Sequence, residues 1–280
     1  RQAQQYFHTF CGVLRVLMLF VAGVVVVAIL LGKSPMTLFA GLGATSAVLM
    51  LVFKDTILGL AAGVRLTSND MLHKGDWITV KSVDANGIVE DMSLTTVKVR
   101  NFDNTIVTIS PATLVNGSFQ NWIGMQKSGG RRVKRIVYFD FRSIRLVDET
   151  LKQTLLAKHF ATEDSFKLKE SLQKAIEKDI QEGKDIEDLK NPAALAPTNL
   201  QLYRRFMEKY LRQRPEVNTE LTLMVRHMEA TQCGLPIEFY FFIKDKVWVN
   251  YEHILADIME HAYALANEFD LKIYEQYPEQ

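Results

Sequence analysis

The stretch MTLFAGLGATSAVLMLVFKDTILGLAAG, residues Met36–Gly63, decides how the rest of the chain is organised. Its first eighteen residues, Met36–Phe53, carry no charge. A helix of that length spans about 27 Å, most of the hydrocarbon core of a bilayer. Small side chains recur at helical spacing and let helices approach closely within lipid. They are Ala40, Gly41, Gly43, Ala44, Ser46 and Ala47. The stretch predicts a membrane helix packed against others, either as one more span of a bundle or as the lining of a central pore formed with its own copies.

Charge is divided unevenly along the chain. The 280 residues have a net charge of +1, yet no Asp or Glu precedes Asp55, and only Arg1, Arg15 and Lys33 supply Lys or Arg before Lys54. We therefore expect a membrane portion of about 60 residues and a larger soluble portion with one or two cores. Because the first residue is Arg rather than Met, we also expect further chain upstream. The near-zero net charge gives no reason to expect a nucleic-acid partner.

A second apolar segment, roughly His8–Leu31, precedes the deciding stretch. The turn Gly32-Lys33-Ser34-Pro35 between them is so short that it predicts an antiparallel transmembrane hairpin, with Pro35 starting the second helix. The far side of the hairpin carries most of the flanking basic residues, so the positive-inside rule places the turn outside and both ends in the cytoplasm. Cys11 and Cys233 have no metal or disulfide spacing, which agrees with a reducing compartment for the soluble part.

The charged pair Lys54-Asp55 predicts a bend within the deciding stretch. Asp is unfavourable inside a helix and favourable as an N-cap, so Asp55 is expected to start a new helix. Residues Thr56–Leu72 mix apolar and polar side chains and are interpreted as a helix at the membrane surface. The sequence thus predicts, within residues 36–72, a pore-lining helix, a bend at 54–55 and an interfacial helix.

The remaining residues predict two soluble domains. Residues 73–127 contain short β-branched runs separated by turn signals at Asp84–Gly87 and Asn101–Asn104, typical of a small all-β, Sm/SH3-like barrel. Residues 128–280 are expected to follow the order β-α-α-β-β-α-β, compatible with an α+β ferredoxin-like domain. A strongly charged segment at 163–190 is interpreted as a helical insertion in this domain. The fold class is therefore a multi-domain membrane protein.

Several other signals are weak. Gly41–Ser46 nearly matches a dinucleotide fingerprint but lies in an apolar span without a preceding strand. His253, Asp257 and His261 share one helix face, yet they are more simply a solvated face than a metal site. The basic run Arg131–Arg135 alternates with valine and favours a charged strand over a nucleic-acid patch. No catalytic constellation is apparent, and we expect no enzyme activity, metal or cofactor.

Several motifs follow one another in a characteristic order. They are Leu42-Gly43-Ala44, Gly59-Leu60-Ala61-Ala62-Gly63, Gly75-Asp76-Trp77-Ile78, Gly87-Ile88-Val89-Glu90-Asp91 and Thr95-Thr96-Val97-Lys98-Val99-Arg100-Asn101-Phe102-Asp103-Asn104. Their order and spacing resemble the small-conductance mechanosensitive channel family, most closely its miniconductance branch, and the likeness is strongest over about residues 36–145. Lys54-Asp55 and the segment at 128–135 carry the likeness to the miniconductance branch.

The resemblance implies a homo-oligomer, a heptamer in the family, whose glycine- and alanine-rich helix lines the pore. The first of the family's two sealing leucine positions falls on Ala47 and the second on Leu51, with Ala44 and Phe53 nearby in the pore segment. The inner mouth and hinge fall on Lys54, Asp55, Gly59 and Gly63, where Asp55 replaces the family's helix-breaking glycine. Helix-packing positions fall on Gly41, Gly43 and Ser46. Only one leucine ring is therefore retained.

The resemblance further implies a bacterial inner-membrane channel, surrounded by lipid, that membrane tension opens during hypo-osmotic shock. It would pass ions and small osmolytes with weak selectivity through a hydrophobic gate. Two alternatives remain from the residues alone. One is a channel on the same scaffold that a ligand or partner opens, with 163–190 as the receiving surface. The other is a non-conducting membrane scaffold whose soluble ring recruits partners.

Overall fold

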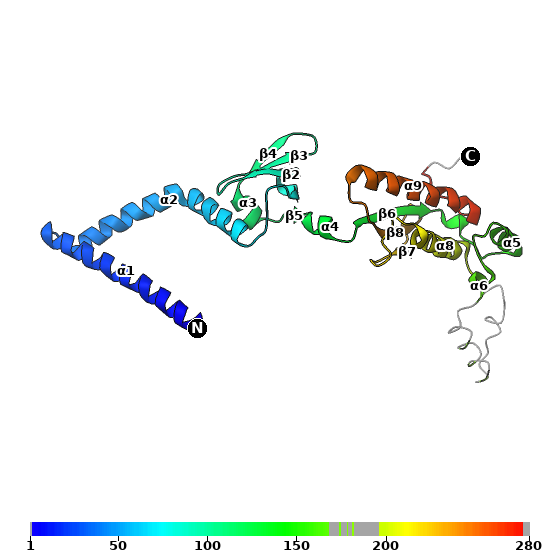
Figure 1. Cartoon of the computed structure of the whole chain (residues 1–280), viewed down its shortest axis with the longest axis horizontal. Helices are drawn as coiled ribbons and strands as arrows, with labels where there is room; N and C mark the ends of the chain where they lie inside the picture. Colours follow the sequence, from blue (N-terminus) through cyan, green and yellow to red (C-terminus); the bar gives the residue numbers. More distant parts are fainter. Residues whose placement is uncertain (1, 168–173, 175–177, 179–180, 182–195, 277–280) are drawn as a thin grey trace. The chain divides into compact units, whose positions relative to one another are not determined.

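A computed structural model describes residues 2–167, 174, 178, 181 and 196–276 of the chain (Figure 1). The chain forms two compact units, Arg1–Trp122 and Ile123–Gln280. The division falls slightly before the boundary between 127 and 128 expected from the sequence. The first unit combines the apolar helices with a β-sheet, and the second contains an α/β layer.

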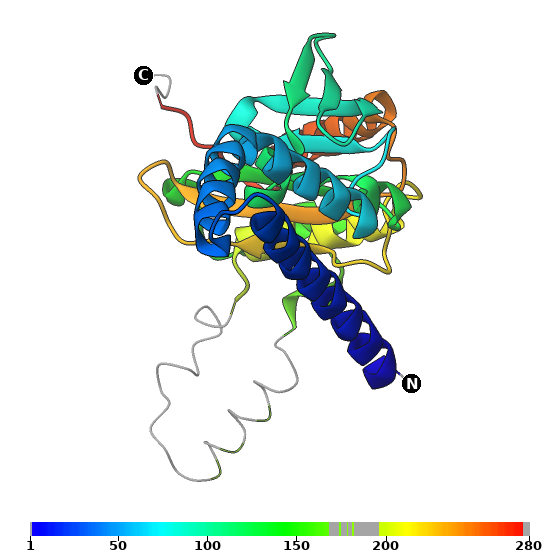
Figure 2. The same cartoon turned by 90° about the vertical axis from the view of Figure 1, so that its left-hand side faces the viewer.

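Two long helices open the first unit. They are α1 (Gln2–Leu30) and α2 (Pro35–Ser68), and Figures 1 and 2 show them meeting at a tight turn and diverging from it. Gly32 ends the first helix with a φ of +62°, and the amide of Lys33 donates to the carbonyl of Ala28. The Ser34 hydroxyl then accepts from the amide of Thr37 and caps α2, with Pro35 as its first residue. The expected hairpin turn is present.

Helix α2 continues without interruption through Lys54 and Asp55. The expectation that Asp55 caps a new helix is therefore wrong, because the backbone keeps its helical hydrogen bonding on both sides of this residue. Figure 1 nevertheless shows the ribbon of α2 changing direction about halfway along its length. The pore-lining and surface segments expected from the sequence are thus two parts of one helix.

A five-stranded antiparallel sheet in the order β4-β3-β2-β1-β5 completes the first unit. Its strands are β1 (Trp77–Val80), β2 (Ala85–Met92), β3 (Val97–Asn101), β4 (Ile106–Ile109) and β5 (Gln120–Asn121). The described pairings leave β4 and β5 as edges, so no hydrogen-bonded β4–β5 pair closes a barrel among them. The short helices η1 (Lys81–Val83) and α3 (Pro111–Asn116) connect the strands, and Ile78, Val89 and Val99 lie in the core.

Of the two turns expected in this sheet, one is present as expected and the other ends earlier. The turn at Asn101–Asn104 is present between β3 and β4, with Asn104 at a φ of +68°. The first turn ends earlier than expected, because Asp84 takes the left-handed conformation and β2 already begins at Ala85. Gly87 therefore pairs with Asn101 inside the sheet. A Cβ atom there would lie 1.9 Å from the Arg100 carbonyl oxygen, so the close strand approach requires glycine.

The second unit packs helices onto a three-stranded antiparallel sheet in the order β6-β8-β7. Its described elements are α4 (Ile123–Lys127), β6 (Arg131–Phe139), η2 (Phe141–Ser143), α5 (Glu149–Ala157), α6 (Glu163–Phe166), α8 (Asn199–Gln213), β7 (Met224–His227), β8 (Leu235–Ile243), α9 (Trp248–Ala266) and η4 (Asn267–Phe269). Ile273 adds an antiparallel bridge to Phe139 at the outer side of β6. Of the expected insertion at 163–190, only residues 163–167 and the three single positions 174, 178 and 181 lie within the described residues.

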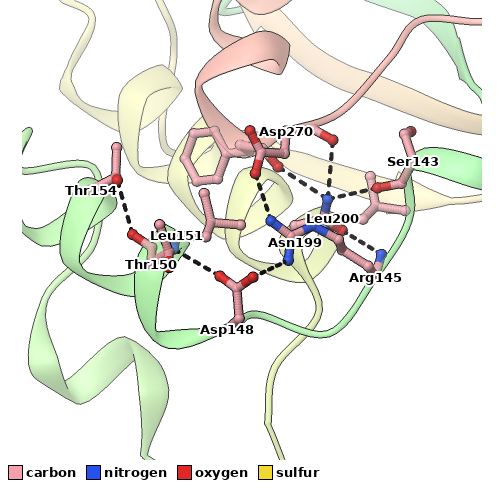
Figure 3. A network of polar contacts seen from close by, with 10 residues as sticks. Ser143, Arg145, Asp148, Thr150, Leu151, Thr154, Asn199, Leu200 and Asp270 are labelled. Carbon is pink, nitrogen blue, oxygen red and sulfur yellow. Dashed lines mark hydrogen bonds and ion pairs between the residues drawn. The ribbon is translucent and has the colours of Figure 1, made fainter.

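A buried asparagine joins three segments of this unit (Figure 3). The Asn199 side chain is fully buried, donates to the carbonyls of Ser143 and Phe269, and accepts from the amide of Arg145. The Arg145 guanidinium forms 2.7 Å ion pairs with Asp148 and Asp270. The Leu151 amide and the Arg145 guanidinium both donate to the Asp148 carboxylate and hold its pKa below the ordinary value. This network fixes the start of α8 against the chain that follows β6 and α9.

Candidate functional site

Helix α2 presents an apolar surface that the chain itself leaves uncovered. Its only buried residues are Ala62, Gly63 and Leu66, close to its C-terminal end. Segments Cys11–Leu30 and Pro35–Ser68 are both long and apolar enough to cross a membrane. Uncovered apolar helices of this kind need lipid or other helices around them.

One stripe of α2 carries the predicted gate. Ala44, Ala47 and Leu51 follow one another at spacings of three and four residues, so they share a helix face. Leu51 is 75 % exposed and is the first large side chain of the stripe after the two alanines. Lys54 and Asp55 lie one turn further on the same side. Along the stripe, small side chains are therefore followed by one large apolar side chain and then by two charged side chains.

Phe53 does not belong to this stripe. Two helical residues turn the side chain by roughly 200°, so Phe53 faces nearly opposite Leu51. The proximity of the two residues in the sequence therefore does not put them in one ring. Ser46, a predicted packing position, lies on yet another side of the helix and is exposed.

Three glycines of α2 have no packing partner among the residues that the structure describes. A Cβ atom added to Gly41, Gly43 or Gly59 meets no atom within 4 Å. Glycine destabilises a helix interior by about 1 kcal/mol relative to alanine, and nothing in the chain offsets that loss. Small residues in a membrane helix are typical of close helix–helix contact. These positions are thus available for contact with another subunit.

Lys54 and Asp55 are both exposed, and neither makes an ion pair among the residues that the structure describes. Adjacent residues of a helix do not face each other, which prevents a pair between them. Within one chain, the two side chains therefore do not pair with each other among the described residues. Both charges lie at the end of the pore segment that the sequence predicts to be cytoplasmic.

The C-terminal end of α2 is built into the sheet. Leu66 is 1 % exposed and joins Leu72 in the core of the β-strands. Gly63 lies against the turn between β2 and β3, where an added Cβ atom would be 2.2 Å from the Leu94 carbonyl oxygen. Here, unlike at Gly59, packing inside the chain requires glycine. A displacement of α2 at this end therefore moves the sheet with it.

A polar cluster around Asp76, a residue that the sequence marks only through the motif Gly75-Asp76-Trp77-Ile78, completes this junction. Asp76 is 6 % exposed, and its carboxylate accepts from the amide of His73 at 3.1 Å and from the Asn121 side chain at 2.8 Å. The Asn121 amide nitrogen also donates to the carbonyl of Met71. The cluster ties the residues after α2 to β5, the edge strand. The sequence signal for this cluster is the Gly75-Asp76 pair directly before β1, because a carboxylate at such a position can accept hydrogen bonds from the amides of a turn.

The remaining candidate residues have structural roles. His261 contacts the carbonyl of Asp257 through Nδ1 at 2.7 Å, and no group of three metal-ligating side chains gathers among the described residues. In the basic strand β6, Lys134 lies 3.5 Å from the buried Glu238 carboxylate, and the guanidinium of Arg131 stacks over the ring of Tyr251. The basic strand is therefore engaged with its own sheet and with α9.

Comparison with known proteins shows that the first unit is similar to parts of mechanosensitive ion channels. The β-domain model of the mechanosensitive ion channel family matches residues 55–124. The small-conductance mechanosensitive channel MscMJ of Methanocaldococcus jannaschii is 34 % identical over 84 residues, 30 % of this chain and 23 % of that protein. The large-conductance channel MscMJLR of the same organism is 29 % identical over 141 residues, 50 % of this chain and 38 % of that protein. The matches thus span well under half of these relatives.

Two solved structures share the fold of nearly the whole chain. The cryo-EM structure of Arabidopsis thaliana MSL1 has a TM-score of 0.59 at 10 % identity and covers 96 % of this chain and 76 % of its own. The closed-state crystal structure of Helicobacter pylori MscS has a TM-score of 0.54 at 13 % identity, with coverages of 96 % and 81 %. At these identities the likeness concerns the fold.

Proposed function

Because the chain belongs to the small-conductance mechanosensitive channel family, we propose that it forms an ion channel opened by membrane tension. One observation carries the proposal: a long helix, uncharged from Met36 to Phe53 and uncovered there, carries a small-residue stripe and runs directly into the family's β-domain. We further propose that the channel acts in hypo-osmotic shock, in a bacterial inner membrane, and that it is most similar to the miniconductance branch.

The proposed gate is a ring of Leu51 side chains contributed by copies of α2. A narrow apolar ring sheds water, so ions meet a desolvation barrier without any plug. Ala44 and Ala47 are too small to close the same pore at their own levels. The pore is thus closed by a single ring, and Lys54 and Asp55 place opposite charges just beyond it, which agrees with weak selectivity.

Tension acts on this gate through the area that each state occupies in the bilayer. A force shifts a two-state population only by its differential effect on the two states. The lipid-facing perimeter, formed by α1 and any helices preceding it, is therefore the proposed sensor. Opening separates the Leu51 side chains until water enters the ring.

Assembly into a ring of identical subunits, a heptamer as in the family, follows from the same helix. Gly41, Gly43 and Gly59 have open space within one chain, which supports their role in contacts between subunits. The β-sheet of the first unit and the whole second unit would lie in the cytoplasm. The strand order β6-β8-β7, extended by Ile273 beside β6, supports a ferredoxin-like arrangement for the second one. The proposal needs no metal or cofactor.

The test is a patch-clamp recording of the full-length protein in liposomes under stepped suction. We expect discrete openings whose probability rises with tension. Leu51→Ser should lower the opening threshold, because a polar ring keeps water in the closed pore. Leu49→Ser makes the same change on the opposite side of α2 and should leave the threshold near that of the wild type.

The outcomes separate the alternatives. Silence up to membrane rupture would overturn tension gating in favour of a ligand-gated channel or a scaffold. Openings with equal thresholds in Leu51→Ser and the wild type would retain the channel but refute the gate assigned to Leu51.

A further inference from the structure

The second unit contains a small cavity outside the proposed pore. Its volume is about 180 Å³, well above the 10–15 Å³ or so needed for one water molecule. The cavity lies between the chain that follows α5, the short helix α6 and the middle of α8; Figure 1 labels these three helices. Phe160 and Phe206 pack edge to face at 5.2 Å in its wall, next to the buried Leu202. One side of the cavity is therefore apolar.

The other side is cationic. Arg205 and Lys209 lie four residues apart on α8 and line the cavity together with His159. Like charges at this spacing repel each other across a helix turn. Among the described residues, none of these three side chains makes a hydrogen bond or ion pair. Three nitrogen-bearing side chains thus converge on one cavity without an anionic partner.

His159 is held there by an unusual backbone. It follows the end of α5 with a φ of +60°, and its amide donates to the carbonyl of Leu156. Helices commonly end in this conformation with glycine, since a side chain is disfavoured there. The left-handed residue instead places an imidazole at the cavity. Strained positions of this kind are often retained at binding sites.

Two hydroxyl groups add hydrogen-bond donors. The Ser165 hydroxyl accepts from the amide of Thr162, and the two hydroxyl oxygens lie 3.2 Å apart. In such a pair one hydroxyl donates to the other, and the accepting hydroxyl keeps its own hydrogen available. The cavity therefore offers a neutral donor opposite the cations of α8.

Neighbouring acids are already engaged elsewhere. Asp164 pairs with Lys167 at 2.7 Å, and Glu163 lies 4.0 Å from Lys152. Glu208, on α8 itself, accepts from the amide of Val225. No carboxylate of the described residues lines the cavity. An external anion would thus meet uncompensated positive charge.

We propose that this cavity binds a small phosphate monoester whose carbon body packs on Phe160 and Phe206. A phosphate group carries about two negative charges near neutral pH and three acceptor oxygens, which suit a guanidinium, an ammonium and a hydroxyl converging on it. The apolar wall fits a short organic body better than a free inorganic ion. This proposal goes beyond ion conduction and does not depend on it, because the cavity belongs entirely to the second unit.

The test is calorimetric titration of the full-length protein in lipid nanodiscs at pH 8 and constant ionic strength. Phenyl phosphate is the probe, and inorganic phosphate is compared with it. We expect saturable binding of phenyl phosphate that is tighter than that of inorganic phosphate. Arg205→Ala and Lys209→Gln should each weaken binding about ten-fold or more, as the loss of a charge-assisted hydrogen bond does.

The matched control is Arg212→Ala, which removes an exposed cation from the same helix outside the cavity. It should leave the dissociation constant within about two-fold of the wild type. Unchanged melting temperatures show that the two cavity variants are folded, and either one alone suffices for the test. Absence of binding, or equal binding in the cavity variants and the wild type, would overturn the site. Equal affinities for inorganic phosphate and phenyl phosphate would overturn the ester as its ligand.

Discussion

Replacing Gly63 by alanine tests whether α2 and the sheet move as one body. The added Cβ atom would lie 2.2 Å from the carbonyl oxygen of Leu94 and 2.9 Å from its carbonyl carbon. Both are backbone atoms, so no side chain can rotate away to make room. To reach an ordinary contact of about 3.4 Å, the turn between β2 and β3 must retreat by about 1.2 Å. The change therefore pushes the helix and the sheet apart.

Two opposing contributions set the change in stability that Gly63→Ala causes. Overpacking of this kind destabilises by about 1–3 kcal/mol, whereas alanine stabilises a helix by about 1 kcal/mol relative to glycine. We expect a net local destabilisation of up to about 2 kcal/mol for Gly63→Ala. Gly59→Ala is the matched control, because it makes the same change one turn earlier where nothing lies within 4 Å.

The assay is amide hydrogen exchange of the turn between β2 and β3 in the full-length protein. The Ser93 amide donates to the carbonyl of Thr96 at 2.8 Å, and the Thr96 amide donates to the Ser93 hydroxyl at 3.0 Å. A loss of 2 kcal/mol accelerates their exchange about 30-fold. Unchanged exchange in Gly63→Ala, or equal acceleration in Gly59→Ala, would refute the close packing of helix and sheet.

Three further predictions concern the second unit and the β-sheet of the first unit. Asn199→Ala should destabilise the second unit by about 2–3 kcal/mol, because it leaves buried backbone groups unpaired; chemical denaturation measures this, and a change below about 0.5 kcal/mol would contradict it. The guanidinium of Arg226 holds the pKa of Glu238 below its usual value, so this stabilisation is present at neutral pH and lost as pH falls through the folded pKa. Glu238→Gln should therefore lower the free energy of unfolding more at pH 7 than at pH 3. An equal decrease at both pH values would contradict a stabilising ion pair between Glu238 and Arg226. Asp76→Ala should speed exchange of the amides around β5, where Asn121 loses its hydrogen bond to the Asp76 carboxylate, and should leave exchange in β8 unaltered.

The sequence predicts most of the soluble fold because its signals are local. Pro35 after a short turn, and β-branched runs between turn residues, specify their elements without long-range information. The Gly87 assignment fails because glycine marks either a turn or a close strand approach, and only the pairing with Asn101 distinguishes them. The cluster around Asp76 requires β5 to return to β1, a contact that no local pattern encodes.

Within the candidate site, the resemblance implies the gate positions Ala47 and Leu51, and helical periodicity adds only that they share one face with Ala44. The same periodicity, applied to Phe53, would have removed that residue from the gate. The behaviour of Asp55 is not predictable from propensity, since a continuous apolar helix on both sides outweighs its preference for a cap. The cavity at Arg205 also has no sequence signature, because its walls come from α8 and from a loop some forty residues earlier.

The unbroken helix α2 has a mechanical consequence. From the anchored Leu66 to Leu51 there are about 22 Å of helix at 1.5 Å per residue. That length acts as a lever arm, and a tilt of about 5° at the anchored end displaces Leu51 by about 2 Å. Small rotations of the sheet are thereby amplified at the level of Leu51. In the proposed channel, torque applied to the sheet from the aqueous side and stretch applied from the bilayer would act on the same joint.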